Sequence, residues 1–270
     1  MGRPKVRFSG IDQLLNGKAR TKTLVVLNRF RKDGVELKKV GCFGSDGDST
    51  FSGCRAGVAA RLMRLQLLLL AFYCVLHQVL LGSKDATKSV PFLHTHFFNL
   101  LEQLGRYYDD SPKREAILQK FQLQELGFLI KIIRSAFTRW LTHDGVSDRV
   151  HRSFVPMLME LRQSSSSDAT SLGLYSMLRT REFISFLLIS RDVLPVVSHL
   201  SGTWQANSTD FIVVDQTLRV ACAALEKQMD TPGTHSTQQQ NTIASLEASG
   251  FEIRQTPGRT DLWVTQSRRK

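Results

Sequence analysis

The spacing of apolar side chains along the chain changes near residue 90. Before that point, short apolar segments separated by turn residues predict alternating helix and strand. The pattern predicts a basic helix at 18–32, a strand at 37–43, a helix at 53–65 and a buried strand running into a helix from 67 onward. This alternation is typical of α/β proteins.

After residue 90 the apolar positions follow a helical period, as Phe92, Phe97, Leu101 and Leu104 illustrate. Ser111-Pro112 is a typical helix start, and Asp168 is a candidate N-cap. Further helices are expected within 111–126, 139–162, 182–200 and 213–229. The polar stretch 231–270 is expected to be a peripheral tail. The fold class predicted is therefore α/β plus mostly α.

The most apolar run, Leu67 to Leu76, is ten residues long. A helix needs roughly 20 residues to cross a bilayer, so we expect no membrane span here. The chain has four cysteines and no signal-like start, which predicts an intracellular, reducing setting without disulfides.

The net charge of +12 comes from the two ends of the chain. Residues 1–40 hold eleven Lys and Arg against three acids, and residues 254–270 hold five against one, whereas 41–253 has twenty of each sign. A polyanionic partner would therefore be bound mainly by the ends. The candidate nucleic-acid contacts are Lys18, Arg20, Lys22, Arg29 and Arg31. The alternative is that these ends only keep the protein soluble.

Asp46 is the candidate catalytic or metal-binding residue, because it follows an expected strand within a glycine-rich turn. Carboxylates at the carboxyl ends of strands are common ligands in α/β sheets. The alternative is that Asp46 serves turn geometry. Asp48 is a second carboxylate whose direction the sequence leaves open.

Cys74 and His77 form a C-x-x-H pair, and Cys42 and Cys54 would complete four zinc ligands. The spacing fits no common zinc finger, so packing roles for these cysteines are the alternative. The chain has no phosphate-binding loop, dinucleotide fingerprint, serine-hydrolase elbow or H-E-x-x-H motif.

Arg139 and Trp140, followed by His143 and Asp144, place a cation, an aromatic ring, an imidazole and a carboxylate close together. Such a cluster can stack on and neutralise nucleic acid. The alternative is a half-buried tryptophan that packs a helix in place. Five other aromatic residues are expected in the core: Phe72, Tyr73, Phe97, Phe98 and Phe128.

Four stretches, in this order, resemble the core of transposases of the hAT superfamily, with the closest similarity to the zinc-finger-fused, transposase-derived proteins of animals. They are LKKVGCFGSDGDSTFSGCRAGVAARL (37–62), YCVLHQVLL (73–81), SPKREAILQKFQ (111–122) and TRWLTHDGVSDRV (138–150). The resemblance implies an RNase H-like core interrupted by a large helical insertion domain. In that family, two aspartates and one glutamate hold divalent ions for DNA cleavage and joining.

By this resemblance Asp46 takes the place of the second aspartate, Cys74 and His77 match the C-x-x-H block, and Arg139 and Trp140 match an R-W block. The first aspartate and the glutamate have no clear equivalents. The expected organisation is a basic arm and helix at 1–34, a truncated RNase H-like core at 35–89, an insertion-like domain at 90–230 and the polar tail at 231–270.

The sequence thus predicts a nuclear, catalytically inactive remnant of a hAT transposase that binds DNA or another protein, with a homo-oligomer also open and no membrane partner. No cofactor is expected, and Mg²⁺ enters only with residual activity. One alternative is an active metal-dependent nuclease or transposase that uses Asp12 and Glu226. The other is a helical scaffold that does not bind DNA.

Overall fold

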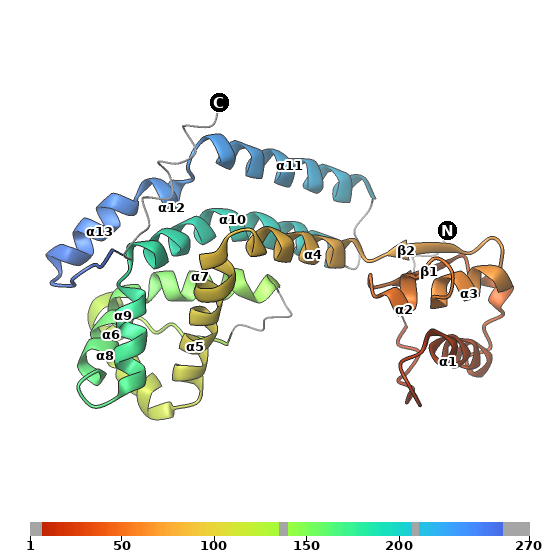
Figure 1. Cartoon of the computed structure of the whole chain (residues 1–270), viewed down its shortest axis with the longest axis horizontal. Coiled ribbons are helices and arrows are strands. Elements are labelled where there is room, and N and C mark those ends of the chain that lie inside the picture. The colour runs from red at the N-terminus through yellow and green to blue at the C-terminus, as the bar shows by residue number, and fades with distance from the viewer. Residues whose placement is uncertain (1–6, 135–139, 207–210, 256–270) are drawn as a thin grey trace. The chain divides into compact units, whose positions relative to one another are not determined.

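The computed structural model describes residues 7–134, 140–206 and 211–255, and the chain divides into two compact units, 1–85 and 86–270 (Figure 1). The fold is mostly helical with a small parallel sheet, which confirms the predicted class of α/β plus mostly α. The first unit contains α1 (Ala19–Lys32), a 3₁₀ turn (Leu37–Lys39), β1 (Cys42–Ser45), α2 (Ser49–Ser52), α3 (Val58–Leu65), β2 (Leu70–Tyr73) and the start of α4 (Val75–Lys88).

The first unit has a small core in which α1 packs against α3. Val58, Leu62 and Leu69 are almost fully buried. The apolar face of α1, which includes Val26 and Leu27, packs against them. Residues three, four and seven apart lie on one face of a helix, so the expected helix at 18–32 forms and presents this face to α3.

The two strands pair in parallel, with Cys42 opposite Leu70 and Ser45 opposite Tyr73. The strand expected at 37–43 is wrong in position, because residues 37–39 form the 3₁₀ turn instead. There the amide of Lys39 donates to the carbonyl of Glu36, and the Lys39 ammonium pairs with the Glu36 carboxylate at 2.9 Å. These local bonds favour a turn over an extended chain.

The apolar run after residue 67 does form a strand followed by a helix, as expected, but the strand is not buried. Leu70, Phe72 and Tyr73 are each at least half exposed. The described sheet has only two strands, so no third described strand pairs with β2.

The second unit is an array of helices. Its elements are a π-helical turn (Leu93–Phe97), α5 (Phe98–Asp109), α6 (Pro112–Leu126), α7 (Trp140–Arg152), α8 (Phe154–Ser164), α9 (Ala169–Leu178), α10 (Arg181–Gln205), α11 (Phe211–Asp230), α12 (Thr234–Thr237) and α13 (Gln239–Ala248). The two expected caps are confirmed: the Ser111 hydroxyl accepts from the amide of Arg114, and the Asp168 carboxylate accepts from that of Thr170.

The core of the second unit is built around α5, α8 and α10, with Phe97, Leu158 and Phe183 fully buried. Ile243, Leu246 and Phe251 belong to the same core, which differs from the peripheral tail expected at 231–270. Ile243 and Leu246 lie on one face of α13. The chain after them forms a bridge in which Arg254 exchanges backbone hydrogen bonds with residues 179 and 181.

The aromatic residues expected in the core divide into two groups. Phe97 and Phe98 are buried, as expected, whereas Phe72, Tyr73 and Phe128 are 55%, 50% and 46% exposed. Phe72 and Tyr73 lie on the uncovered strand, and Phe128 follows the left-handed glycine that ends α6, with the Arg152 guanidinium 5.5 Å from its ring centre.

The loop after α6 is held by a fully buried glutamine. The amide of Gln122 donates to the carbonyl of Ile130 at 2.8 Å and to the Ser153 hydroxyl at 2.9 Å, and its oxygen accepts from the amide of Ile130 at 3.1 Å. One side chain therefore pairs with both backbone groups of Ile130, as a neighbouring strand would.

Within the described parts of the chain, α10 is the one helix long and apolar enough to cross a membrane. Half of its most apolar window is buried inside the protein, and α10 contacts α7, α11 and α12. That environment is typical of the central helix of a folded bundle.

Candidate functional site

Asp46 lies at the carboxyl edge of the two-stranded sheet, as the sequence predicts. β1 ends at Ser45, and the carbonyl of Ser45 accepts a hydrogen bond of 2.8 Å from the amide of Cys74, the residue after β2. Since the strands are parallel, Asp46 and Cys74 leave the sheet at the same edge. This edge is where open α/β sheets place their ligands.

The two carboxylates of this loop bond to their own backbone. Asp46 accepts from the amide of Asp48 at 3.3 Å, and Asp48 accepts from the amide of Thr50 at 2.7 Å, which caps α2. The hydrogen bonds from Thr50 lower the pKa of Asp48, and the nearby charge of Lys22 acts in the same direction. The geometry serves the turn, which is the alternative that the sequence left open for Asp46.

The same loop lies beside the first turn of α4. A methyl group added at Gly47 would be 3.4 Å from Cδ2 of His77 and 3.5 Å from the side-chain nitrogen of Gln78. The structure therefore brings the Ser-Asp-Gly turn close to the Cys74–His77 pair, although Asp46 and Cys74 are 28 residues apart in the sequence. Cys74 is exposed and is not in a disulfide.

Metal-binding sets are not formed by the described residues, among which no group of three or more His, Cys, Asp or Glu side chains is placed to hold an ion. Cys42 begins β1, whereas Cys74 follows the end of β2, so a strand's length separates two of the four candidate zinc ligands. Asp12 forms an ion pair of 2.7 Å with Arg29, and Glu226 belongs to α11 in the second unit.

The basic residues of α1 have different surroundings. Lys18, Arg20 and Arg31 are exposed. The Lys22 ammonium lies 4.1 Å from the ring centre of Phe51, and Arg29 is held by Asp12. Three of the five candidate contacts are therefore fully available to a polyanion, and Lys22 and Arg29 have structural partners as well.

Sequence reasoning missed the arginines of the connection between the strands. Arg55 and Arg64 are exposed, and Arg61 donates to the carbonyl of Ala56. They lie in the stretch 41–253, whose charges cancel when counted together. A count by structural unit finds them: residues 1–85 hold fifteen Lys and Arg against six acids, while residues 86–270 hold twenty-one against eighteen.

The cluster around Trp140 is only partly described. Arg139 and the side chain of Trp140 lie outside the described residues, although Trp140 begins α7. His143 is 2% exposed with its ring centre 4.6 Å from that of Phe98, and burial lowers its pKa to about 4. Asp144 pairs with Arg191 at 2.9 Å. His143 therefore packs in the core and Asp144 is held in an ion pair, which favours the packing alternative for these two residues.

The second unit contains a buried polar network that the sequence did not predict, because its members are isolated polar residues within helices. Glu160 on α8 is fully buried and accepts hydrogen bonds from Tyr108 at 2.9 Å, Ser164 at 2.8 Å and Tyr107 at 3.4 Å. Burial raises the pKa of Glu160 against the effect of these hydrogen bonds. With its acceptors satisfied inside the core, this carboxylate has a structural role.

Comparison with known proteins gives no match for this chain, whether with family models, curated proteins or solved structures.

Proposed function

We propose that this chain binds nucleic acid through its first unit and is a catalytically inactive derivative of a hAT-like transposase core. The observation that carries the proposal is the uneven charge of the two units: an excess of nine positive charges in residues 1–85 against three in residues 86–270. A concentrated positive surface is the feature that binds a phosphate backbone, because each neutralised phosphate releases counterions.

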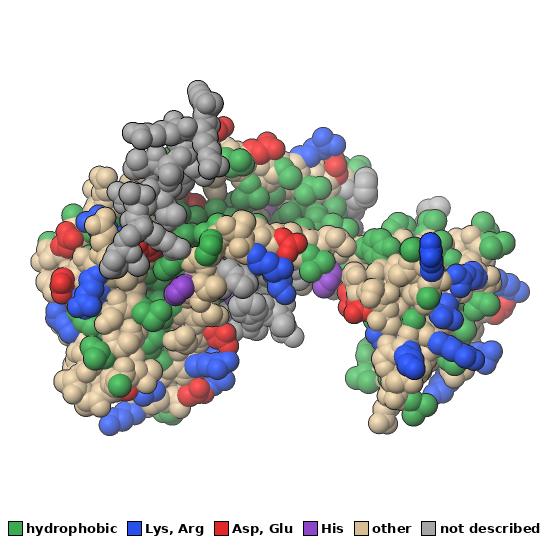
Figure 2. Space-filling view, in the orientation of Figure 1, with side chains coloured by type: hydrophobic (Ala, Val, Ile, Leu, Met, Phe, Trp, Pro, Cys, Tyr) green, Lys and Arg blue, Asp and Glu red, His purple; other side chains and the backbone are tan. Residues whose placement is uncertain are grey.

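Several described cations of the first unit are uncompensated. Among the described residues, Lys18, Arg20, Arg31, Arg55 and Arg64 form no ion pair with a carboxylate, and all five are exposed. Figure 2 shows Lys and Arg side chains over the visible face of this unit. A polyanion can therefore approach these groups without breaking ion pairs within the protein.

The loop at the sheet edge supports the family assignment within the proposal. If the separate sequence blocks belong to one conserved core, the Ser-Asp-Gly turn and the C-x-x-H pair should lie close together. Gly47 of the turn and His77 of the pair are neighbours in the structure. The parallel strands and the connecting α3 fit part of an RNase H-like core. A nuclear location and DNA as the binding partner follow from the same resemblance.

The proposal of inactivity rests on the ligands at this edge. Two-metal DNA cleavage needs ligands on both sides of a pair of ions held about 4 Å apart. Asp46 and Asp48 offer two carboxylates, and both accept hydrogen bonds from backbone amides of their own loop.

The test is DNA binding by the full chain, measured as fluorescence anisotropy of a labelled duplex between about 50 and 300 mM salt. The variant Lys18→Gln/Arg20→Gln/Arg31→Gln removes three exposed cations, two in α1 and one at the residue before it. We expect its affinity to fall by about tenfold or more at low salt. The slope of log affinity against log salt should decrease by about 0.9 for each phosphate that the variant no longer neutralises.

A matched control removes three exposed cations of the second unit, in Lys113→Gln/Lys120→Gln/Lys131→Gln. It changes the net charge by the same amount but should leave affinity within about twofold of the parent chain. Equal reductions of affinity in the two triple variants would contradict a site on the first unit. Absence of binding even at about 50 mM salt would support the helical scaffold instead.

A further inference from the structure

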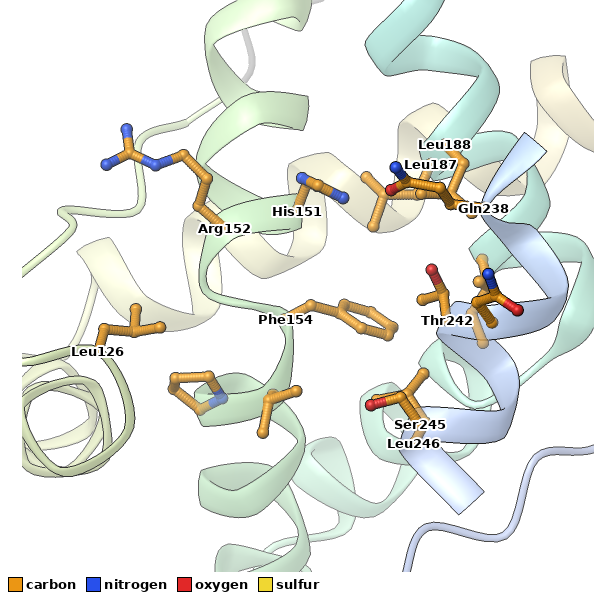
Figure 3. A pocket seen from close by; sticks show the side chains of 14 residues that line it. Leu126, His151, Arg152, Phe154, Leu187, Leu188, Gln238, Thr242, Ser245 and Leu246 are labelled. Carbon is orange, nitrogen blue, oxygen red and sulfur yellow. The ribbon is translucent and has the colours of Figure 1, made fainter. Parts of the chain in front are cut away.

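The second unit contains a pocket of about 450 Å³ between α7 and α8 on one side and α10 and α13 on the other (Figure 3). This volume is within the range of small-molecule sites in proteins. Its floor is apolar and closed, since five lining side chains are at most 6% exposed: Phe154, Ile184, Leu187, Leu188 and Leu246.

Polar side chains border this floor. Figure 3 shows His151 reaching from α7, and Gln238 and Thr242 from the α12–α13 side, toward the space beside the Phe154 ring. Among the described residues, the side chains of Gln238, Asn241, Thr242 and Ser245 form no hydrogen bond, so their donors and acceptors are available. An apolar floor with a few available polar groups is the usual composition of a ligand site.

The polar groups directed into the pocket are neutral. The one charged lining residue is Arg152, and its guanidinium points away from the other labelled side chains and pairs with Asp148 at 3.5 Å. The pKa of His151 is lowered by burial and by the charges of His235 and Arg191, against the opposing effect of Asp148, which favours the neutral imidazole.

A charged ligand would lose hydration in this pocket without gaining an opposite charge, and that loss opposes its binding. A neutral ligand does not lose the hydration energy of a charge when it enters the pocket. The amide of Gln238 offers donors and an acceptor side by side, and the hydroxyl of Thr242 offers both functions. Together they match a ligand edge that carries a carbonyl next to an N–H group.

We infer that this pocket is a binding site for a neutral aromatic compound whose apolar rings lie on the Phe154 and Leu187 floor and whose amide-like edge faces Gln238 and Thr242. The inference does not depend on nucleic-acid binding, because every lining residue lies in the second unit.

The test compares three probes of similar shape and different charge with the full chain by isothermal titration calorimetry at pH 7: 2-naphthamide, 2-naphthoate and 2-naphthylmethylammonium. We expect the neutral amide to bind at least about tenfold more tightly than either ion, which corresponds to about 1.4 kcal/mol. Similar affinities for the amide and an ion, or no binding of the amide, would overturn the inference.

Location is tested by filling the pocket from α13. Ser245→Trp introduces a large ring at an exposed lining position, and Ala244→Trp introduces the same ring at an exposed neighbour that does not line the pocket. We expect the affinity for 2-naphthamide to fall at least about tenfold in the first variant and less than about twofold in the second. Circular dichroism of both variants checks that each folds, and equal affinities in the two folded variants would place the binding elsewhere and reject the site.

Discussion

Acidification should destabilise this protein through His143, a buried histidine of α7. Its side chain is 2% exposed against Phe98, and burial lowers its pKa from 6.5 to about 4. Between these two values the unfolded chain takes up a proton that the folded chain does not. The free energy of unfolding contributed by His143 is therefore fully present above pH 6.5 and is lost as the pH falls toward 4.

The magnitude follows from the two pKa values. A difference of one pKa unit corresponds to about 1.4 kcal/mol, so the full loss is about 3 kcal/mol, of which about 2 kcal/mol is already lost at about pH 4.5. The total stability of a domain is typically about 5–15 kcal/mol. One buried imidazole therefore accounts for a considerable part of the acid sensitivity of the second unit.

The assay is urea unfolding followed by far-UV circular dichroism at about pH 7.0 and about pH 4.5, for the parent chain and for His143→Gln. The variant is expected to be less stable at pH 7 but to lose about 2 kcal/mol less on acidification than the parent. His199→Gln, at an exposed histidine, is the control and should keep the parent's pH dependence. If His143→Gln loses as much stability on acidification as the parent, the reasoning about burial is refuted.

Three further predictions test the network, the packing and the sheet edge. Glu160→Ala should cost about 2–4 kcal/mol in urea unfolding, because it leaves the buried Tyr108 hydroxyl without its acceptor and opens a cavity. Because the folded pKa of Glu160 is raised, the stability that it contributes is present below pH 4.5 and is lost as the pH rises through the folded value. Glu160→Gln should therefore gain stability relative to the parent as the pH rises above about 4.5, and a difference that stays constant with pH would contradict this. Gly105→Ala should cost about 1–3 kcal/mol, since the added methyl would lie 2.8 Å from Cα of Arg134, whereas Gly173→Ala on α9 meets no atom within 4 Å and should gain about 0.5–1 kcal/mol in the same unfolding assay. Nicking of supercoiled plasmid with Mg²⁺ or Mn²⁺ should be equal for the parent chain and Asp46→Ala, and activity that disappears in Asp46→Ala would reject the proposed inactivity.

Features set by neighbouring residues in the chain were predictable from the sequence. Ser111-Pro112 and Asp168 begin helices where expected, because a cap bonds to amides only two or three residues away. The position of Asp46 after a strand was likewise predicted, since a strand followed by a glycine-rich turn is a local pattern.

Features that depend on what covers a segment were not predictable. The run that forms β2 has the composition of a buried strand, yet its exposure depends on the number of strands beside it. Ile243 and Leu246 are two apolar residues in a polar stretch, and only the packing of α13 against α10 places them in the core. The sequence does not distinguish His143 from a surface histidine, because only the packing around its side chain gives it a structural role.

The pairing of Gln122 with Ile130 has a consequence for engineering the protein. By its position between two helices, the loop after α6 would be chosen as a site for a tag or a circular-permutation cut. However, the length of the segment from Gly127 to Ile130 is fixed by the two hydrogen bonds between Gln122 and the backbone of Ile130. An added residue there would move Ile130 out of register with Gln122 and leave a buried amide unpaired. The serine-rich loop at 165–167, whose hydroxyls bond only to nearby carbonyls, is the better insertion point in the second unit.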